Sequence, residues 1–502
     1  MNELLLDMNN ITKTFGDVIA CNKVNFSVKT GEVHAVLGEN GAGKSTLMNI
    51  ISGIYIPDKG QIKFMGSDVR FQSPKDSINK GIAMIHQHFK LVETLSVLDN
   101  LLLGQVKNTF INRRKASEYF KKKALEFQID IDLSASVSEI SMGQKQLVEI
   151  IKVLSRNPKL IILDEPTTVL TPQEVSNLFN IINNLKQSGI SIIFISHKMD
   201  EVFEVSDSLT ILRKGYSIVT RSIKGLSENE ICEYMVGEPI DLNIKKVKTN
   251  YTNTILKLDH VSSLNDEGQL GLKNLSLELK AGEILGVAGI NGHGQKELCE
   301  VISGIRKLTD GKIIFKDEDI TKMTVKDILR HGIQMSFVPE DRLGMGLIPK
   351  MGIVDNILLK DYYKKGLFLD YTWSKTCAKS IVDELDVKTT SLSSPISLMS
   401  GGNIQKVLIG REIKTNPELL ITAYPVRGLD INTTLKIYSL LQEQKKKGVG
   451  IIYIAEDLDS LLEISDRLLV LHHGKSMGIY APSTITKEEV GLMMVGSEII
   501  HA

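Results

Sequence analysis

The sequence contains one internal duplication, and this repeat constrains the fold more than any other feature. A segment that begins KTGEVHAVLGENGAG at Lys29 aligns with KAGEILGVAGINGHG at Lys280, 251 residues later. Farther along, Ser141 matches Ser400, 259 residues later. Because the offset drifts by only a few residues, the two halves are predicted to be duplicated domains that differ by small loop insertions.

The repeat sets the domain boundaries that we expect. A first domain is predicted at residues 1–240 and a second at 254–502. Between them, residues 241–253 are polar, rich in Lys, Asn and Thr, and without apolar periodicity, which is typical of a linker. Within each copy, strand-like runs alternate with helical patterns, so each copy is predicted to have an α/β core built on a parallel sheet.

Individual elements can be predicted for the first copy. Strands are expected at 32–37, 160–163 and 191–195, and helices at 44–52 and 172–186. Between residues 91 and 154, long helix-compatible stretches such as 115–127 predict a separate helical lobe.

Composition and charge exclude several classes of protein. The 60 Lys and Arg residues balance 60 Asp and Glu residues, so the overall charge does not indicate a nucleic-acid partner or an anionic membrane surface. No apolar run approaches the ~18 residues of a spanning helix and the N-terminus has no secretory-signal pattern, so we expect a cytosolic chain that does not cross a membrane. Spacing rules out a CxxC metal site or a disulfide framework, and we expect reduced thiols at Cys21, Cys232, Cys299 and Cys377.

A phosphate-binding loop is predicted at residues 38–45, GENGAGKS, between a strand and a helix. The segment fits the pattern GxxxxGK[ST] in the context that this pattern requires. Its glycines let successive backbone N–H groups point at phosphate oxygens, and the N-terminus of the helix adds the positive end of a dipole. Lys44 is expected to reach the β- and γ-phosphates, and Ser45 to ligate Mg²⁺.

Two carboxylates follow an apolar strand farther along the chain, in LIILDEP at residues 160–166. Acids at the carboxyl end of a buried strand lose hydration unless they bind a cation or accept a proton. Asp164 is therefore expected to hold Mg²⁺ through its water shell, and Glu165 to act as general base toward the attacking water. An ordinary acidic pair at a strand-to-loop junction is the alternative, and the presence of the phosphate loop disfavours it.

Together with four weaker signals, these residues resemble those of the ATP-binding cassette family. Ser141 begins SMGQ, which resembles the family's signature motif with methionine where glycine is commoner. Gln87 in IHQHF resembles the glutamine that contacts Mg²⁺ and the membrane partner, and His197 in ISHK resembles the switch histidine that contacts the γ-phosphate. Phe15 resembles the aromatic residue that stacks on adenine, where tyrosine is more usual.

The resemblance implies a fold, ligands and functional residues. It implies two tandem P-loop NTPase domains, each with a RecA-like α/β core and a helical subdomain, that bind ATP and Mg²⁺. The implied metal ligands are Ser45, Gln87 and Asp164, and the implied catalytic residues are Glu165, His197 and Gln87. The residues implied to bind ATP are Phe15, Gly38, Glu39, Asn40, Gly41, Ala42, Gly43, Lys44, Ser45 and Thr46 in the first copy and Ser400, Gly401, Gly402, Gln405 and Asp430 in the second.

The second copy lacks most of the catalytic side chains. Gln295 stands where the first copy has Lys44, and Lys296 replaces Ser45. Further replacements follow the same alignment: AYP at 423–425 for DEP at 164–166, Glu340 for Gln87, and Glu456 for His197. The second half is therefore not expected to hydrolyse ATP.

The second copy nevertheless keeps a signature motif. Its SGGNIQ, from Ser400, is closer to the family consensus than SMGQ, and Asp430 retains the aspartate of the family's D-loop where the first copy has Thr171. In the family, two cassettes meet head to tail, with each ATP between one copy's phosphate loop and the other copy's signature. The resemblance thus implies one hydrolytic composite site, with the first copy's loop and the second copy's signature, and one degenerate site around Gly289.

Two cassettes in one chain without a spanning helix resemble the ATPase subunit of bacterial importers for simple sugars and nucleosides. The AYP strand end, VPEDR at 338–342 and Gln295 favour the nucleoside branch. This resemblance implies two transmembrane permease subunits in separate chains and an extracellular solute-binding protein that acts through the permease. It also implies a place on the cytoplasmic face of the cell membrane and no direct contact with nucleic acid.

Two other functions are weighed against this one. A soluble twin-cassette ATPase acting on ribosomes or nucleic acid is the main alternative, but ribosomal versions usually carry two hydrolytic sites and a long charged linker, and DNA-repair versions carry zinc cysteines. A non-hydrolytic binding scaffold conflicts with the presence of Lys44, Glu165 and His197.

Overall fold

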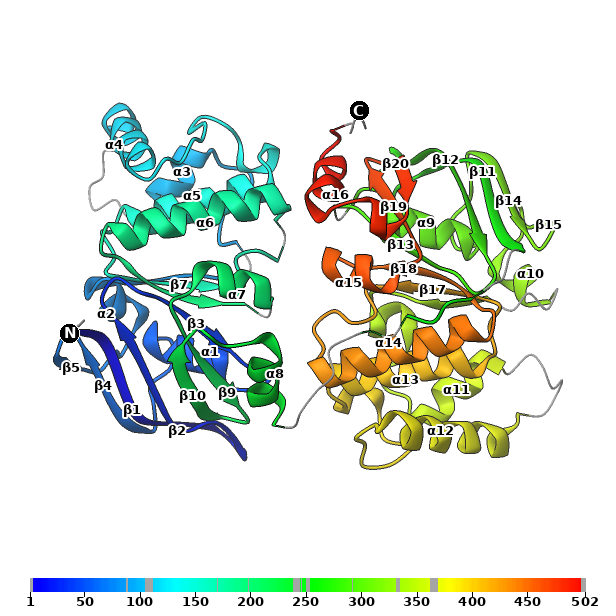
Figure 1. Cartoon of the computed structure of the whole chain (residues 1–502), viewed down its shortest axis with the longest axis horizontal. Coiled ribbons are helices and arrows are strands. Elements are labelled where there is room, and N and C mark those ends of the chain that lie inside the picture. Colours follow the sequence, from blue (N-terminus) through cyan, green and yellow to red (C-terminus); the bar gives the residue numbers. More distant parts are fainter. Residues whose placement is uncertain are drawn as a thin grey trace. The chain divides into compact units, whose positions relative to one another are not determined.

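The computed structural model of the chain divides into two compact units, Met1–Asp241 and Leu242–Ala502 (Figure 1). The residues that it describes are 3–86, 89–103, 112–168, 170–196, 198–237, 244, 246–249, 253–290, 292–330, 335–361 and 369–497. Over these residues, each unit contains one four-stranded sheet and one six-stranded sheet.

The larger sheet of unit 1 has the order β10-β9-β3-β8-β7-β6. Five strands are parallel and β10 pairs antiparallel at one edge. The strands are β3 (Val33–Leu37), β6 (Ile82–Ile85), β7 (Leu160–Asp164), β8 (Ser191–Ile195), β9 (Ser208–Arg213) and β10 (Tyr216–Ser222). The central strands β3 and β8 are buried along their whole length because other elements cover both faces, as is usual for parallel sheets. The strands predicted at 32–37, 160–163 and 191–195 are confirmed within one residue.

An antiparallel sheet of order β2-β1-β4-β5 packs beside it through one hydrophobic core. Its strands are β1 (Leu4–Phe15), β2 (Val18–Lys29), β4 (Lys59–Phe64) and β5 (Ser67–Val69). The helices of the unit are α1 (Lys44–Ile51), α2 (Pro74–Asn79), α3 (Val97–Leu102), α4 (Arg113–Glu126), α5 (Met142–Leu154), α6 (Pro172–Gln187), α7 (Met199–Val205) and α8 (Glu228–Val236). Helices α3, α4 and α5 contact one another and form the predicted helical lobe (Figure 1).

Unit 2 repeats this architecture strand for strand. Its sheets have the orders β16-β17-β18-β13-β19-β20 and β12-β11-β14-β15. The strands are β11 (Thr254–Leu264), β12 (Leu270–Lys280), β13 (Ile284–Ala288), β14 (Asp310–Phe315), β15 (Glu318–Asp319), β16 (Met335–Val338), β17 (Leu419–Ala423), β18 (Gly450–Ile454), β19 (Arg467–His472) and β20 (Lys475–Tyr480). The duplication detected in the sequence is therefore a duplication of topology.

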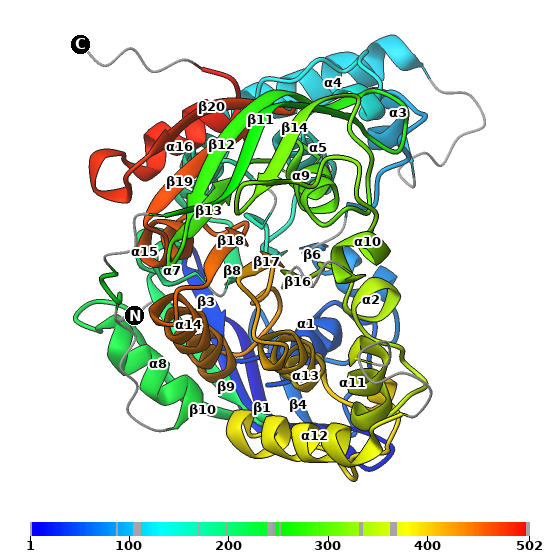
Figure 2. The same ribbon diagram turned by 90° about the vertical axis from the view of Figure 1, so that its right-hand side faces the viewer.

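The helices of unit 2 follow the same plan. They are α9 (Gln295–Ile302), α10 (Val325–Arg330), α11 (Ile353–Asp361), α12 (Tyr371–Leu385), α13 (Gly401–Lys414), α14 (Ile431–Lys446), α15 (Leu458–Ile464) and α16 (Lys487–Met494). Helices α11, α12 and α13 contact in sequence and make the helical lobe of this unit (Figure 2). Short helical turns lie at Val137–Glu139, Arg342–Gly346, Ile396–Leu398 and Pro482–Thr484.

Two further expectations can be compared with the described residues. All four cysteines are buried free thiols, as predicted. Over the described part of the chain, no helix has the length and apolar character needed to span a membrane. Part of the predicted linker lies along unit 2, since the backbone N–H of Val247 donates to Gln442 Oε1 and Lys246 Nζ donates to the carbonyl oxygens of Leu462 and Ser465.

Candidate functional site

The loop between β3 and α1 in unit 1 contains glycines in left-handed or extended positive-φ conformations. Gly38 has a φ of 150° and Gly43 a φ of 104°, both in the region that favours glycine. A Cβ on Gly38 would lie 2.3 Å from the carbonyl oxygen of Leu212, and one on Gly43 would lie 2.4 Å from that of Ala20. The two glycines are therefore required by close backbone contacts. Gly43 also forms the N-cap of α1, so the N–H groups of the first turn point into the loop.

Lys44, the first residue of α1, folds back over this loop. Its Nζ donates to the carbonyl oxygens of Gly38 at 2.5 Å and Glu39 at 3.1 Å. Burial lowers the pKa of Lys44, while the carboxylates of Glu165, Asp164 and Glu39 act in the opposite direction. The ammonium is thus held inside the loop by weak carbonyl partners that phosphate oxygens can replace with stronger, charge-assisted bonds.

The two acidic residues at the end of β7 face the same lysine. Burial, then the neighbouring charge of Glu165, raise the pKa of Asp164, and Lys44 lowers it. Carboxylate oxygens of this kind are ligands that a divalent cation such as Mg²⁺ prefers. The structure brings Lys44 close to Asp164 and Glu165, although the lysine lies about 120 positions before the two acids in the sequence.

Glu165 occupies a strained backbone position. Its φ is 47°, a left-handed conformation that costs a non-glycine residue free energy, and its backbone N–H donates to the carbonyl oxygen of Ile195 at 2.9 Å. Tyr424, 259 residues later in unit 2, has a φ of 51° and donates to Ile454 at 2.8 Å. Both units therefore keep the same backbone, and only the side chain placed on it differs.

The remaining predicted residues of unit 1 lie in several environments. Ser45 is exposed and Thr46 half-buried in the first turn of α1, and Ala42 is buried beneath them. Phe15, at the end of β1, is 42% exposed and contacts Tyr55 edge to face at a centroid distance of 5.1 Å. An exposed ring of this kind is available to stack on a flat ligand. Gln87 and His197 lie outside the described residues.

The signature motif of unit 1 is covered by a carboxylate that the sequence analysis missed. Ser141 is the N-cap of α5, and its Oγ donates to Glu174 Oε1 of α6 at 3.1 Å. A Cβ on Gly143 would lie 2.2 Å from the same Oε1. Glu174 also forms a capping box with Thr171. The capping box explains why the pattern of α6 alone gives no sign that Glu174 also reaches the signature.

The signature motif of unit 2 has no such cover. Ser400 is the N-cap of α13 and accepts from Asn403 Nδ2 at 2.8 Å. A Cβ on Gly402 would lie 3.6 Å from its nearest atom, Asp430 Oδ2, which is an ordinary van der Waals contact and not a clash. Asp430 caps α14, and its carboxylate accepts from the backbone N–H and the hydroxyl of Thr433. Thr433 is the residue that aligns with Glu174.

Two other residues complete the description of this motif. A Cβ on Gly401 would lie 3.3 Å from Nη1 of Arg342. Gln405 is 1% exposed, so the structure places its side chain inside the unit and apart from the exposed edge of the motif.

The phosphate loop of unit 2 keeps the shape of the first but not its charges. Gly294 has a φ of 110° and caps α9 as Gly43 caps α1. Gln295, in place of Lys44, is 3% exposed and donates from Nε2 to the carbonyl oxygen of Ile290 at 3.1 Å. Lys296 turns away to Asp266, with a distance of 2.6 Å from Nζ to Oδ2. The loop therefore presents no ammonium to a phosphate.

In unit 2, Arg427 contacts two acidic residues and a tyrosine. Arg427 Nη1 lies 2.5 Å from Glu340 Oε1 and 3.5 Å from Glu456 Oε1, and its guanidinium carbon lies 5.9 Å from the ring centroid of Tyr424. Glu340 and Glu456 align with Gln87 and His197 of the first copy. The sequence analysis did not single out Arg427. Its alignment with a neutral residue, Thr168, is the signal that could have found it. Unit 2 therefore has an arginine with two acidic partners here, while Ala423 and Tyr424 stand in place of Asp164 and Glu165.

Comparisons with known proteins identify the family of the chain. The ABC transporter family profile matches residues 21–168 and 272–425. The nucleoside import ATP-binding protein NupA of Lactococcus lactis subsp. cremoris is 41% identical over 99% of both chains. The guanosine import ATP-binding protein NupO of Bacillus subtilis is 38% identical over 99% of this chain and 98% of its own. The galactose/methyl galactoside import ATP-binding protein MglA of Pasteurella multocida is 39% identical over 97% of both chains.

These matches extend over both copies and nearly the full length of each relative. They agree with the duplicated fold of the two units. The chain therefore belongs to the ABC transporter family and carries two of its ATPase cassettes in one polypeptide.

Proposed function

We propose that the chain is the ATP-hydrolysing subunit of an importer for nucleosides or simple sugars, with the nucleoside branch favoured. The names of the relatives support an import function, and the first of them is a nucleoside import protein that is similar over 99% of the chain. The single observation that carries the enzymatic part is the convergence of Lys44, Asp164 and Glu165 beside one phosphate loop.

In the proposed mechanism, unit 1 binds and hydrolyses ATP. Backbone N–H groups of residues 39–46 and the Lys44 ammonium bind the β- and γ-phosphates, and Phe15 stacks on the adenine. Ser45, Asp164 and Gln87 would hold Mg²⁺, which neutralises phosphate charge as the terminal bond breaks. The site fits such an ion because the Asp164 carboxyl group is partly buried beside Glu165 and Lys44, and Mg²⁺ prefers oxygen ligands.

Glu165 is proposed as the general base of this reaction. Its carboxylate accepts a proton from the attacking water, and the strained backbone at φ 47° fixes where that carboxylate starts. His197 is proposed to contact the γ-phosphate, and Gln87 to orient the water and the metal. Unit 2 has no counterpart of this base because Tyr424 stands there.

We further propose that the working site uses the signature of unit 2, with Ser400, Gly401, Gly402 and Asp430 acting on the nucleotide held by the loop of unit 1. The partners of the two signature serines support this assignment, because Ser141 is bonded to the Glu174 carboxylate whereas unit 2 has Thr433 at the position of Glu174. A carboxylate bonded to the signature serine would repel a γ-phosphate at that serine. The site with the degenerate loop would then combine two parts that are both unsuited to hydrolysis.

The proposed partners follow from the import function. Two transmembrane permease subunits in separate chains would bind this chain at the cytoplasmic face of the membrane, and an extracellular solute-binding protein would deliver the solute to them. The absence of a spanning helix over the described residues is consistent with peripheral attachment. No direct role is proposed for nucleic acid.

A transport assay with the purified complex tests this function. We expect ATP-dependent uptake of a radiolabelled nucleoside into proteoliposomes that hold the chain, its permease and its solute-binding protein. Glu165→Gln should stop uptake and steady-state hydrolysis while ATP binding remains, because general-base loss is worth roughly 10²- to 10⁴-fold. Hydrolysis without uptake of any nucleoside or sugar would contradict the import function, and normal turnover in Glu165→Gln would remove Glu165 from the mechanism.

A further inference from the structure

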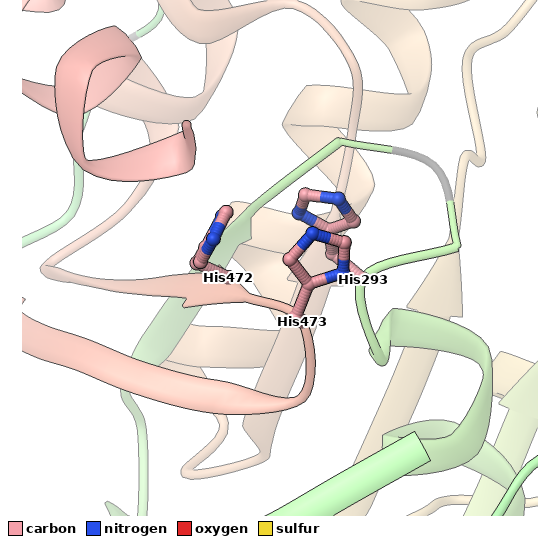
Figure 3. Close-up of side chains that lie close together, drawn as sticks. All are labelled: His293, His472 and His473. Carbon is pink, nitrogen blue, oxygen red and sulfur yellow. The ribbon is translucent and has the colours of Figure 1, made fainter. Parts of the chain in front are cut away.

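Three histidines of unit 2 converge from two separate loops (Figure 3). His293 precedes α9, and His472 and His473 lie where β19 ends and the turn to β20 begins. One nitrogen of each ring lies within 4.8 Å of one nitrogen of each other ring. The ring centroids are separated by 5.0 Å for His293 and His472, 4.2 Å for His293 and His473, and 4.4 Å for His472 and His473. The cluster offers nitrogen donors to one small region of space.

The contacts of the rings hold one of them in place. His472 Nδ1 donates to the carbonyl oxygen of Met494 at 2.9 Å, and its Nε2 lies beside Gly496, where a Cβ would come within 2.6 Å of it. A backbone carbonyl that fixes one ring nitrogen in this way is the usual outer contact of a metal-bound histidine. His293 Nδ1 is buried and has no hydrogen-bond partner among the described residues, which is uncommon for a buried polar atom.

Two of the three rings have a lowered pKa. Burial, then the neighbouring rings of His473 and His472, lower the pKa of His293 to about 4. Burial and His472 lower the pKa of His473 as well. Neutral imidazole is the form that binds metal ions, whereas an anion site would need charged rings.

The first copy shows that the fold does not require these imidazoles. At the equivalent positions it has Ala42, Arg213 and Lys214. Arg213 Nη1 donates to the carbonyl oxygen of Tyr234 at 3.2 Å, much as His472 donates to Met494. Lys214 has a φ of 50° and His473 a φ of 44°, so the turn is the same. Three unlike residues have therefore been exchanged for histidines on an unchanged backbone.

We propose that His293, His472 and His473 form a binding site for Zn²⁺ in unit 2, with a fourth position left to water. Imidazole is a preferred ligand of Zn²⁺, and three histidines with one open position are a known ligand set for it. Bonds of about 2.0–2.1 Å in a tetrahedral site place ligand nitrogens ~3.3 Å apart, so the rings would move inward by roughly 1.5 Å at most. Such an ion would tie the turn before α9 to the turn between β19 and β20.

Zinc titration of the whole chain, without a polyhistidine tag and after treatment with chelator, tests this proposal. Excess Mg²⁺ in the buffer keeps the acidic pair at Asp164 occupied. We expect one equivalent of Zn²⁺ to bind with a micromolar or tighter dissociation constant by calorimetry. Co²⁺ used as a probe should give visible absorption bands without the charge-transfer band of a thiolate, because the four cysteines are buried.

The matched variant carries the residues of the first copy, His293→Ala, His472→Arg and His473→Lys. Because the same backbone accepts these residues in unit 1, the variant should fold, and its affinity for Zn²⁺ should fall at least about 30-fold. His260→Asn is the control: His260 belongs to unit 2 but lies outside the cluster, and asparagine tolerates its φ of 52°. Equal Zn²⁺ binding by the triple variant, a thiolate band with Co²⁺, or no binding by the native chain would each overturn the proposal.

Discussion

Arg427 and Glu340 of unit 2 form an ion pair, 2.5 Å from Nη1 to Oε1, and Glu340 stands where the first copy has Gln87. Both side chains are 46% exposed, so the pair itself adds little to stability. Its consequence is electrostatic. In unit 2 a guanidinium faces the carboxylates of Glu340 and Glu456, whereas in unit 1 the Lys44 ammonium faces Asp164 and Glu165.

Restoring one acid should therefore not make unit 2 catalytic. In a Glu165→Gln background, Tyr424→Glu is expected to leave steady-state hydrolysis at the level of the single variant. The loop still lacks an ammonium at Gln295, and Arg427 would pair with the new carboxylate. Phosphate release from the reconstituted complex measures this, with Tyr424→Gln as the neutral control. A recovery of more than about 10-fold would show that the base alone was missing.

Lys44→Ala should weaken nucleotide binding far more than Gln295→Ala. Losing a charge-assisted contact to phosphate is worth about 1.5–3 kcal/mol, or roughly 10- to 100-fold in the dissociation constant. Gln295 is buried and bonded to the carbonyl of Ile290, so its replacement should affect stability more than affinity. Binding of a fluorescent ATP analogue compares the two. Equal losses of affinity would contradict the difference between the loops.

Asp164→Asn should stabilise the nucleotide-free chain at neutral pH. The pKa of Asp164 is raised in the folded state, so its contribution to stability is fully present only below the unfolded pKa and is lost as the pH rises through the folded value. Asparagine removes this cost, and we expect a melting temperature about 1–3 °C higher at pH 7. The gain should vanish in acid. Added Mg²⁺ and ATP should stabilise the native chain more than the variant. A lower melting temperature for the variant without ligand would contradict the raised pKa of Asp164.

The fold and half of the site could be predicted because they depend on local patterns. The loop at 38–45, the strand ending in Asp164 and the duplication all follow from glycine spacing, apolar runs and self-alignment. Their partners in the parallel sheet follow from topology, and the structure places Lys44 beside both carboxylates.

The parts that could not be predicted depend on side chains that reach between elements. Glu174 forms an ordinary capping box in its own helix, and only the three-dimensional structure shows its contact with Ser141. His293 and His472 are 179 residues apart in the sequence, so the three histidines show no metal-ligand spacing there. Self-alignment does show each of these positions as a difference between the copies, which makes such differences the signal to examine.

The two signature motifs should respond unequally to the same change. Ser400→Arg is expected to stop hydrolysis, because the signature of unit 2 is assigned to the nucleotide at Lys44. Ser141→Arg should reduce hydrolysis only partly, since Glu174 can pair with the new guanidinium at a site without chemistry. The serine pair is preferred to Gly401 and Gly143 because a Cβ on Gly143 would already clash with Glu174. Greater damage from Ser141→Arg would mean that the working site has been assigned wrongly.

Exchanging the residue that differs beside each signature tests the same assignment without a bulky group. Thr433→Glu would place a carboxylate next to Ser400, as Glu174 is placed next to Ser141. A like charge facing a γ-phosphate costs several kcal/mol, so we expect hydrolysis to fall by at least about 100-fold. Thr433→Gln, similar in size but neutral, should retain most activity and controls for the lost hydrogen bond to Asp430.

The reverse change, Glu174→Thr, should alter the rate less than about 2-fold, because removing the repulsion does not supply the missing lysine and base of the opposite loop. Steady-state rates of the three variants in the assembled transporter decide the matter, and activation by Glu174→Thr or full activity in Thr433→Glu would contradict the proposed division of labour between the signatures.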